Sequence, residues 1–207
     1  MTVELTLRDE KLSELTHDRL KTFEALVAKW SPKINLVAKS TLGDIWNRHI
    51  IDSVQLYEHL PQAVNRVADF GSGGGFPGIV MAVLSAQYEP QAQHILVESD
   101  QRKATFLREA VRQCGLNAQV LSERIEAVPA LQADVVTARA LAALPQLLEW
   151  LQPHMRPNAT AILPKGAAYQ SEVDAALEKW QFDLAVHPSR TEPLARILCV
   201  TRLSRRP

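Results

Sequence analysis

The segment 69–78, with the sequence DFGSGGGFPG, constrains the fold of this chain more than any other feature. It holds five of the chain's eight glycines. Glycine permits positive φ and lets the backbone approach a ligand closely, and Pro77 suits the first turn of a following helix. An apolar run at 66–70 precedes the segment, and a helical pattern follows it. Strand, glycine loop and helix in this order predict a cofactor-binding unit of an α/β domain.

Short apolar runs alternate with helical patterns from residue 66 onward. The predicted strands are 66–70, 94–98, 118–121, 134–138 and 160–164, and the clearest helical patterns are 102–114 and 170–179. This alternation favours a parallel sheet with helices on both faces. Two more predicted strands, 182–187 and 195–203, are joined by a loop too short for a helical crossover, so we expect them to pair antiparallel.

The first part of the chain carries helical patterns alone. Leu20, Phe23, Leu26, Val27 and Trp30 recur at helical spacing. The pair Ser31-Pro32 is predicted to end this helix, because the residue before proline disfavours helical backbone. A second helix is predicted over 42–60. We therefore expect a helical N-terminal extension, 1–62, packed on a doubly wound, mostly parallel seven-stranded α/β domain, 63–207.

Composition excludes several classes of protein. The chain has 207 residues, of which 46% are hydrophobic and 22% charged, as in ordinary globular domains. Lys plus Arg and Asp plus Glu both number 23, so nucleic acid would have to bind through a local basic patch. No apolar run is long enough for a transmembrane helix, and the N-terminal residues do not resemble a signal peptide. Cys114 and Cys199 form no CxxC motif, so we expect free thiols in the cytoplasm and no zinc site.

The glycine spacing alone leaves two cofactors open. The pattern Gly71-x-Gly73-x-Gly75 after Asp69 is the form used for S-adenosylmethionine, whereas Gly73-x-Gly75-x-x-Gly78 fits a dinucleotide. Glu98 ends the next predicted strand about 20 residues past the loop, where an acidic side chain accepts hydrogen bonds from a ribose. No Tyr-x-x-x-Lys pair of a dehydrogenase is present. A nicotinamide-dependent oxidoreductase and a non-catalytic RNA-binding protein with a relict pocket remain the alternatives.

Several distant motifs carry a resemblance to a known family. They are KINL at 33–36, RHIIDS at 48–53, DFGSGGGFPG at 69–78, VE at 97–98, KATFL at 103–107, RIE at 124–126, ARA at 138–140 and KG at 165–166. In this order they resemble the bacterial 16S ribosomal RNA guanine-N7 methyltransferases, also called the glucose-inhibited division protein B family. The resemblance implies a class I methyltransferase with a Rossmann-like fold that uses S-adenosyl-L-methionine on 16S ribosomal RNA or the small ribosomal subunit.

The resemblance also implies roles for individual residues. The expected cofactor-binding residues are Asp69, Gly71, Gly73, Phe76, Glu98, Ile125, Glu126 and Arg139. The candidates for substrate positioning are His49, Asp52 and Lys165. RNA requires positive charge, and the candidate contacts are Arg48, Arg102, Lys103, Lys165 and Arg202. We expect a monomer and no membrane partner.

The expected reaction needs no catalytic base. Guanine N7 carries a lone pair and no proton, so catalysis reduces to alignment and a suitable electrostatic surface. This agrees with the lack of a nucleophile or dyad in the motifs. A plainer interpretation of RHIIDS is a surface ion pair, because Arg48 and Asp52 would be neighbours four residues apart on a helix.

Overall fold

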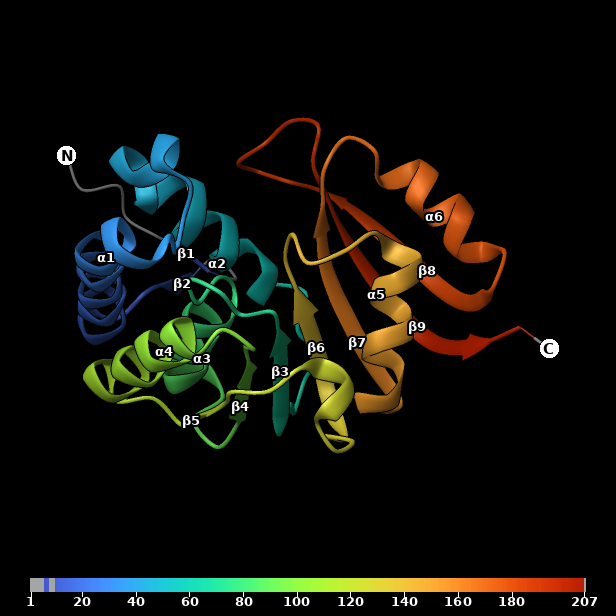
Figure 1. The fold of residues 1–207 in the computed structure, drawn as a ribbon, viewed down its shortest axis with the longest axis horizontal. Helices are drawn as coiled ribbons and strands as arrows, with labels where there is room; N and C mark the ends of the chain where they lie inside the picture. Colours follow the sequence, from blue (N-terminus) through green and yellow to red (C-terminus); the bar gives the residue numbers. More distant parts are fainter. Residues whose placement is uncertain (1–5, 8–9, 207) are drawn as a thin grey trace.

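A seven-stranded sheet forms the centre of the molecule (Figure 1). The computed structural model describes residues 6–7 and 10–206. The strands are β3 (Arg66–Phe70), β4 (Gln93–Val97), β5 (Ala118–Leu121), β6 (Ala133–Ala138), β7 (Met155–Lys165), β8 (Trp180–Pro188) and β9 (Arg196–Arg205). Their order is β5-β4-β3-β6-β7-β9-β8, in which β9 runs antiparallel to both neighbours and the pairs from β5 to β7 are parallel. The predicted sheet and its antiparallel end are confirmed. A separate short ribbon pairs β1 (Thr6–Leu7) with β2 (Glu10–Lys11).

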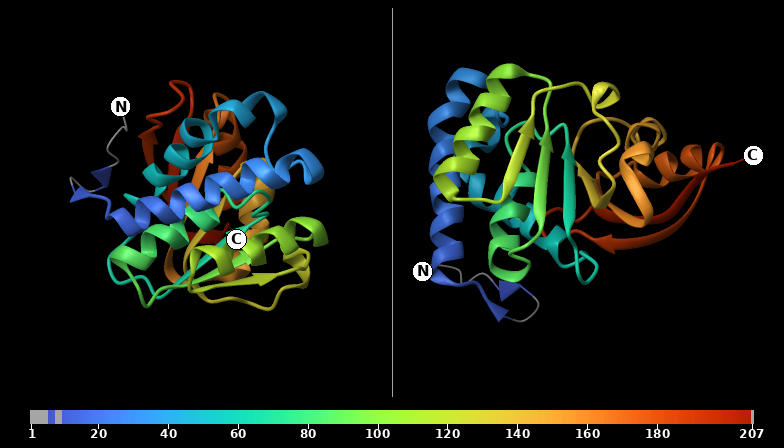
Figure 2. Two further views of the ribbon diagram at one scale, coloured as in Figure 1. Left: turned by 90° about the vertical axis from the view of Figure 1, so that its left-hand side faces the viewer. Right: turned by 90° about the horizontal axis from the view of Figure 1, so that it is seen from below.

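Helices cover both faces of this sheet (Figure 2). The α-helices are α1 (Glu14–Ile34), α2 (Asp52–Tyr57), α3 (Gly78–Tyr88), α4 (Gln101–Cys114), α5 (Leu144–Leu151) and α6 (Tyr169–Leu177). Shorter turns are the 3-10 segments η1 (Lys39–Asp44), η3 (Ile125–Ala127) and η4 (Gln152–His154), and the π-helical η2 (Trp46–Ile51). Helices α1 to α4 pack on one face, and α5 and α6 pack on the other.

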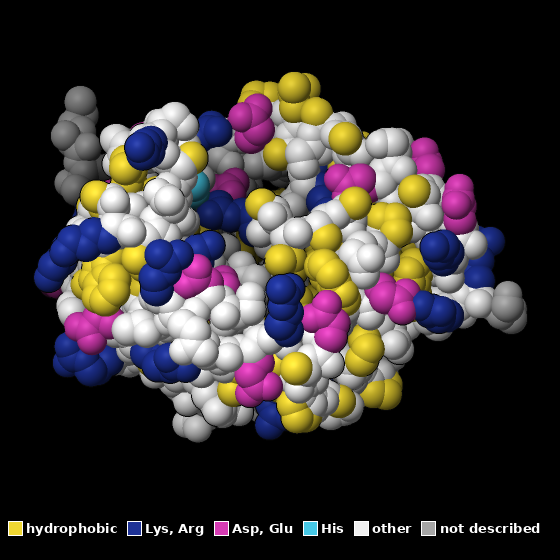
Figure 3. Space-filling model, in the orientation of Figure 1, with side chains coloured by type: hydrophobic (Ala, Val, Ile, Leu, Met, Phe, Trp, Pro, Cys, Tyr) yellow, Lys and Arg dark blue, Asp and Glu magenta, His cyan; other side chains and the backbone are white. Residues whose placement is uncertain are grey.

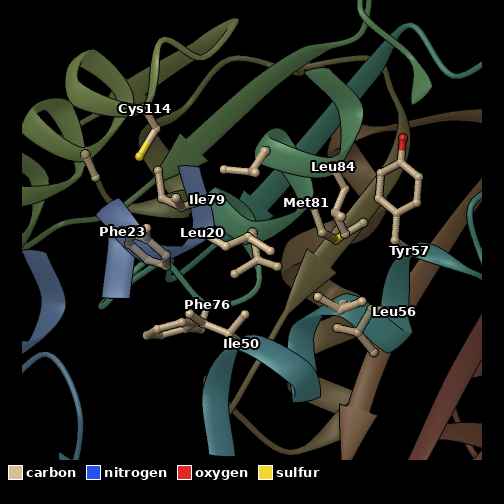
Figure 4. Packing of buried hydrophobic residues seen from close by; sticks show 14 of the residues in the cluster. Leu20, Phe23, Ile50, Leu56, Tyr57, Phe76, Ile79, Met81, Leu84 and Cys114 are labelled. Carbon is tan, nitrogen blue, oxygen red and sulfur yellow. The ribbon is translucent and has the colours of Figure 1, made fainter. Parts of the chain in front are cut away.

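The N-terminal helices share the core of the α/β domain. Strand residues alternate between faces, so Val67 joins the cluster under α1 to α4 while Ala68 joins the cluster under α5 and α6. Phe23 of α1 is fully buried, with its ring centroid 5.0 Å from that of Phe76 in the glycine loop. Figure 4 shows these two side chains beside Ile79 of α3. One apolar cluster therefore connects α1 to the loop that the sequence singled out.

The two predicted N-terminal helices differ from the observed ones. The prediction that α1 ends at Ser31-Pro32 is wrong, because Pro32 lies inside its last turn, where it removes only one backbone hydrogen bond. The helix ends instead at Ile34, and the following residue Asn35 has a left-handed φ of 48° and donates its N–H to the Ser31 carbonyl. The continuous helix predicted over 42–60 is replaced by η1, η2 and α2 in succession.

The strand order creates a crevice at one edge of the sheet. Strands β3 and β6 are neighbours, but the chain continues from β3 toward β4 and from β6 toward β7. The loops that follow β3 and β6 therefore diverge, and ligands of open α/β sheets bind at such points. Within the described residues, no helix combines the length and apolar character needed to cross a membrane.

Candidate active site

Two cavities lie at the carboxyl ends of the parallel strands. The smaller has a volume of about 300 Å³ and is bordered by the loops after β3, β4 and β5. The larger has a volume of about 780 Å³ and lies between the segment 36–55, the loop after β6 and the loop 189–195. Both are lined by Arg139, Ala140 and Leu141, which directly follow β6. Figure 3 shows a hollow on this face with Lys and Arg side chains at its bottom and rim.

Only part of the glycine loop faces the smaller cavity. Gly71 and Gly73 line it, and their φ values of +64° and +53° are left-handed. A Cβ on Gly71 would lie 2.6 Å from Leu141 Cδ1. The loop turns Gly75 inward instead, where a Cβ would lie 2.8 Å from both Phe23 and Ile79. The glycines that face the cavity are thus the first two of the Gly71-x-Gly73-x-Gly75 spacing. This favours the spacing used for S-adenosylmethionine over Gly73-x-Gly75-x-x-Gly78, the spacing used for a dinucleotide.

Glu98 supports the glycine loop and also borders the smaller cavity. Its Oε2 accepts a hydrogen bond of 2.8 Å from the Gly73 N–H, and its Oε1 accepts one of 2.7 Å from the Asp100 N–H. The residue is only 8% exposed. Each carboxylate oxygen keeps a second lone pair, so Glu98 can still accept two hydroxyl groups. Ile125, Glu126 and Lys103 line the same cavity, as expected for Ile125 and Glu126.

Asp69 and Phe76 lie behind the loop and border neither cavity. The Asp69 Oδ1 accepts a hydrogen bond of 2.7 Å from Thr137, while its Oδ2 makes no hydrogen bond. Phe76 is buried, with its ring 5.0 Å from His49 and the Arg139 guanidinium 5.2 Å away. Both residues therefore lie in the protein interior and support the residues that line the site.

Substitution of Asp69 by Asn is expected to change how stability depends on pH. Burial raises the pKa of the Asp69 carboxyl from 3.8 to about 6. Folding then opposes ionisation, so this group lowers the free energy of unfolding as pH rises through its unfolded and then its folded pKa. The loss between pH 4.5 and 7.5 is about 2 kcal/mol. Urea unfolding measures the free energy of unfolding at both pH values. Between pH 4.5 and 7.5 it should fall by about 2 kcal/mol less in the Asp69→Asn protein than in the wild type. Equal pH dependence in the two proteins would contradict this, and the exposed Asp174→Asn is the control.

A hydrogen-bonded network forms the wall between the cavities. The Arg139 guanidinium donates to Asp52 Oδ2 at 3.1 Å and to His49 Nδ1 at 3.2 Å. Arginine can only donate, so Nδ1 accepts and the proton of a neutral ring lies on Nε2. That nitrogen is 2.8 Å from Thr41 Oγ1 and donates to it. Burial and the charge of Arg139 lower the pKa of His49 to about 4. His49 is thus held neutral in one tautomer.

Helix α2 connects this network to the loop 189–195, which also lines the larger cavity. Asp52 Oδ1 accepts a hydrogen bond of 2.5 Å from Thr191, and Gln55 Oε1 accepts one of 2.8 Å from the Arg190 N–H. The plainer interpretation, an ion pair between Arg48 and Asp52, finds no such pair among the described residues. Arg48 lies 3.6 Å from Glu192 instead, because the wider π-helical turn over 46–51 changes which side chains share a face.

The remaining candidates divide between the cavity and other surfaces. Lys165 lines the larger cavity with only 9% of its side chain exposed, and its Nζ donates to the Ala142 carbonyl and to Glu172, both at 2.7 Å. Arg102 is paired with Asp100 on the surface and borders neither cavity. Arg202 is paired with Asp183 near the start of β7, at the opposite edge of the sheet.

Sequence reasoning missed several residues that line these cavities. Thr41, Leu141, Glu172 and Thr191 all contribute to the larger one. Thr191 lies in the short loop between β8 and β9, where no motif marks it. Glu172 follows Lys165 by seven residues, and this spacing carries no signal before α6 is in place.

Comparisons with known proteins agree with this geometry. The GidB family, described as rRNA small subunit methyltransferase G, matches residues 16–195. A protein named ribosomal RNA small subunit methyltransferase G from Ruegeria pomeroyi is 48% identical over 94% of this chain and 95% of its own. The namesake from Cereibacter sphaeroides is 46% identical over 99% of both chains. A crystal structure of a SAM-dependent methyltransferase from Aquifex aeolicus has a TM-score of 0.58 and 16% identity, covering 86% of this chain and 97% of that one. The last similarity supports the fold alone.

Proposed function

Because this chain belongs to the GidB family, described as rRNA small subunit methyltransferase G, we propose that it methylates N7 of a guanosine in 16S ribosomal RNA with S-adenosyl-L-methionine. The observation that carries this proposal is the pair of cavities that meet at Arg139. One has the size and polar groups for a nucleoside-like cofactor, and the other is large enough for a nucleotide. The shared wall brings the two ligands to one boundary.

The residues of the smaller cavity fit the cofactor. Left-handed Gly71 and Gly73 leave a cradle without side chains, and Glu98 faces it with free acceptor capacity for two ribose hydroxyls. Ile125 and Glu126 supply an apolar and a polar edge for the adenine. When bound, the cofactor supplies an electrophilic methyl group on a sulfonium. Asp69 and Phe76 support this cradle from behind.

The larger cavity is proposed to orient the guanosine. Arg139, His49 and Asp52 hold one another in fixed positions, so they present a rigid wall. Neutral His49 adds no positive charge beside the purine that becomes cationic on methylation. Since N7 attacks with its own lone pair, these residues position the base and remove no proton. The Lys165 ammonium also lines this cavity, and beside its bonds to Ala142 and Glu172 it has a third N–H for guanine O6 or a phosphate.

Positive side chains near the cavities are proposed to contact the RNA backbone. Arg48 borders the larger cavity with half of its side chain exposed, and Lys103 borders the smaller one. Arg102 lies next to Lys103 on α4 and can extend this surface. Arg202 is remote from both cavities, so we expect it to contribute little. We further propose that the protein acts as a cytoplasmic monomer on RNA or on the small ribosomal subunit.

A methyl-transfer assay tests the proposal. The protein is incubated with S-adenosylmethionine carrying a labelled methyl group and with either small subunits or 16S RNA that lack the modification. The RNA is then cleaved chemically at N7-methylguanosine, and the label is mapped. We expect the label at one guanine N7. A label on another atom, or cofactor binding without transfer to either substrate, would contradict the assigned substrate.

A further inference from the structure

Three potential metal ligands meet on the face of the sheet under α2, outside both cavities. His59 follows α2, His187 belongs to β8 and Cys199 belongs to β9. Their ligand atoms all lie within 4.8 Å of one another, and no other group of three or more His, Cys, Asp or Glu side chains in the described chain does so. We propose that His59, His187 and Cys199 bind a divalent metal ion of zinc type. The expectation of no zinc site rests on ligand spacing along the sequence, and these three residues are far apart in sequence.

Sheet register explains why these side chains meet. His187 is paired with Ile197, and Ala185 is paired with Cys199. His187 and Cys199 are therefore diagonal neighbours on one face of the hairpin. Helix α2 packs over this face, since its residues share an apolar cluster with Ile197, and it delivers His59 to the same place. The two imidazole rings stack with centroids 4.2 Å apart.

The donor set selects the class of metal. Two imidazoles and one thiolate suit zinc and related transition metals, whereas magnesium and calcium require oxygen ligands. Zinc bonds of about 2.0–2.3 Å imply separations of about 3.3–3.8 Å between ligand atoms in a tetrahedron. The observed upper limit of 4.8 Å is close enough for side-chain rotation to close the site. The imidazoles must turn out of their stack so that their lone pairs converge.

The surroundings permit binding. All three residues are half-buried, which leaves a fourth position open to water. Within the described residues, no hydrogen bond occupies the ring nitrogens of His59 and His187 or the Cys199 sulfur. The charged neighbours of His59 are Glu58 and Arg190. On binding, the Cys199 S–H bond breaks, its proton goes to solvent and a sulfur–metal bond forms. Affinity is therefore expected to rise with pH.

The site would connect two parts of the larger cavity. Asp52 and Gln55 of helix α2 also accept hydrogen bonds from the loop 189–195. A metal ion between His59 and the β8–β9 hairpin would add a second attachment between the same elements. At a free metal concentration of about 100 times the dissociation constant, it should raise Tm by about 5–10 °C.

Cobalt binding tests this proposal directly. Untagged protein is stripped with a chelator, reduced and titrated with Co²⁺, and then Zn²⁺ is added in competition. We expect one equivalent of Co²⁺ to give thiolate-to-cobalt charge-transfer absorption, which Zn²⁺ abolishes. Cys199→Ala and His187→Gln should lose the absorption and the rise in Tm, whereas the controls Cys114→Ala and His17→Gln should keep both.

The result can also exclude the site. A metal-free protein with no cobalt absorption and no zinc-dependent rise in Tm would overturn the proposal. So would binding that survives in both Cys199→Ala and His187→Gln. Circular dichroism of each metal-free variant checks that the fold is retained, and His59→Gln provides a third independent variant if one of the others does not fold.

Discussion

Glu98→Gln is expected to weaken S-adenosylmethionine binding by at least about 100-fold. The carboxylate would accept two ribose hydroxyls in charge-assisted bonds, each contributing roughly 1.5–3 kcal/mol. It also accepts the N–H groups of Gly73 and Asp100. An amide has one oxygen, so its NH₂ group must face one of these two donors and disturb the glycine loop.

Calorimetric titration of both proteins with the cofactor measures this effect. The exposed Glu178→Gln removes the same charge at a distance and should bind as the wild type does. Thermal unfolding without cofactor separates lost binding from lost structure. An unchanged dissociation constant in the Glu98→Gln protein would contradict the assignment of Glu98 to the ribose.

Arg139→Lys is expected to lower kcat by about 100-fold while stability stays near that of the wild type. Lysine keeps a positive charge beside Asp52, but its ammonium cannot reproduce the planar fork that reaches Asp52 and His49 together. His49 would then lose the donor that fixes its tautomer. The positive charge at position 139 would remain, but Asp52 and His49 would no longer be held in fixed orientations.

Arg139→Ala should cost stability as well. Removal of one partner of a fully buried ion pair costs about 3–5 kcal/mol. Asp52 is about one-fifth exposed and keeps its hydrogen bond from Thr191, so we expect about 2 kcal/mol. Steady-state kcat and urea unfolding of both variants test these expectations. Arg112→Lys, at an exposed ion pair on α4, is the control. Wild-type kcat in the Arg139→Lys protein would show that Arg139 has no positioning role.

The sequence predicted the parts of the site that depend on neighbouring residues. Strand, glycine loop and helix at 66–88 are where periodicity and glycine spacing placed them. Glu98 was identified because its distance from the loop along the chain fixes its place in a doubly wound sheet. These features follow from local backbone preferences and from strand order.

The contacts that give the site its shape could not be predicted in this way. Arg139 and Asp52 are 87 residues apart, and the π-helical turn that aims His49 and Asp52 has no signal in the sequence. Family resemblance assigned Phe76 to the cofactor, whereas the structure buries it between Phe23 and His49. Such contacts depend on tertiary packing, which overrides local pattern.

The larger cavity has a consequence for synthesis of the chain on the ribosome. Its walls come from residues 36–55 near the start and 189–197 near the end, joined across β6 and β7. The lining of the smaller cavity is complete by residue 150. During synthesis, every residue that lines the smaller cavity is therefore made before the hairpin that completes the wall of the larger cavity. The wall of the larger cavity is complete only when the β8–β9 hairpin has been made and has docked on α2.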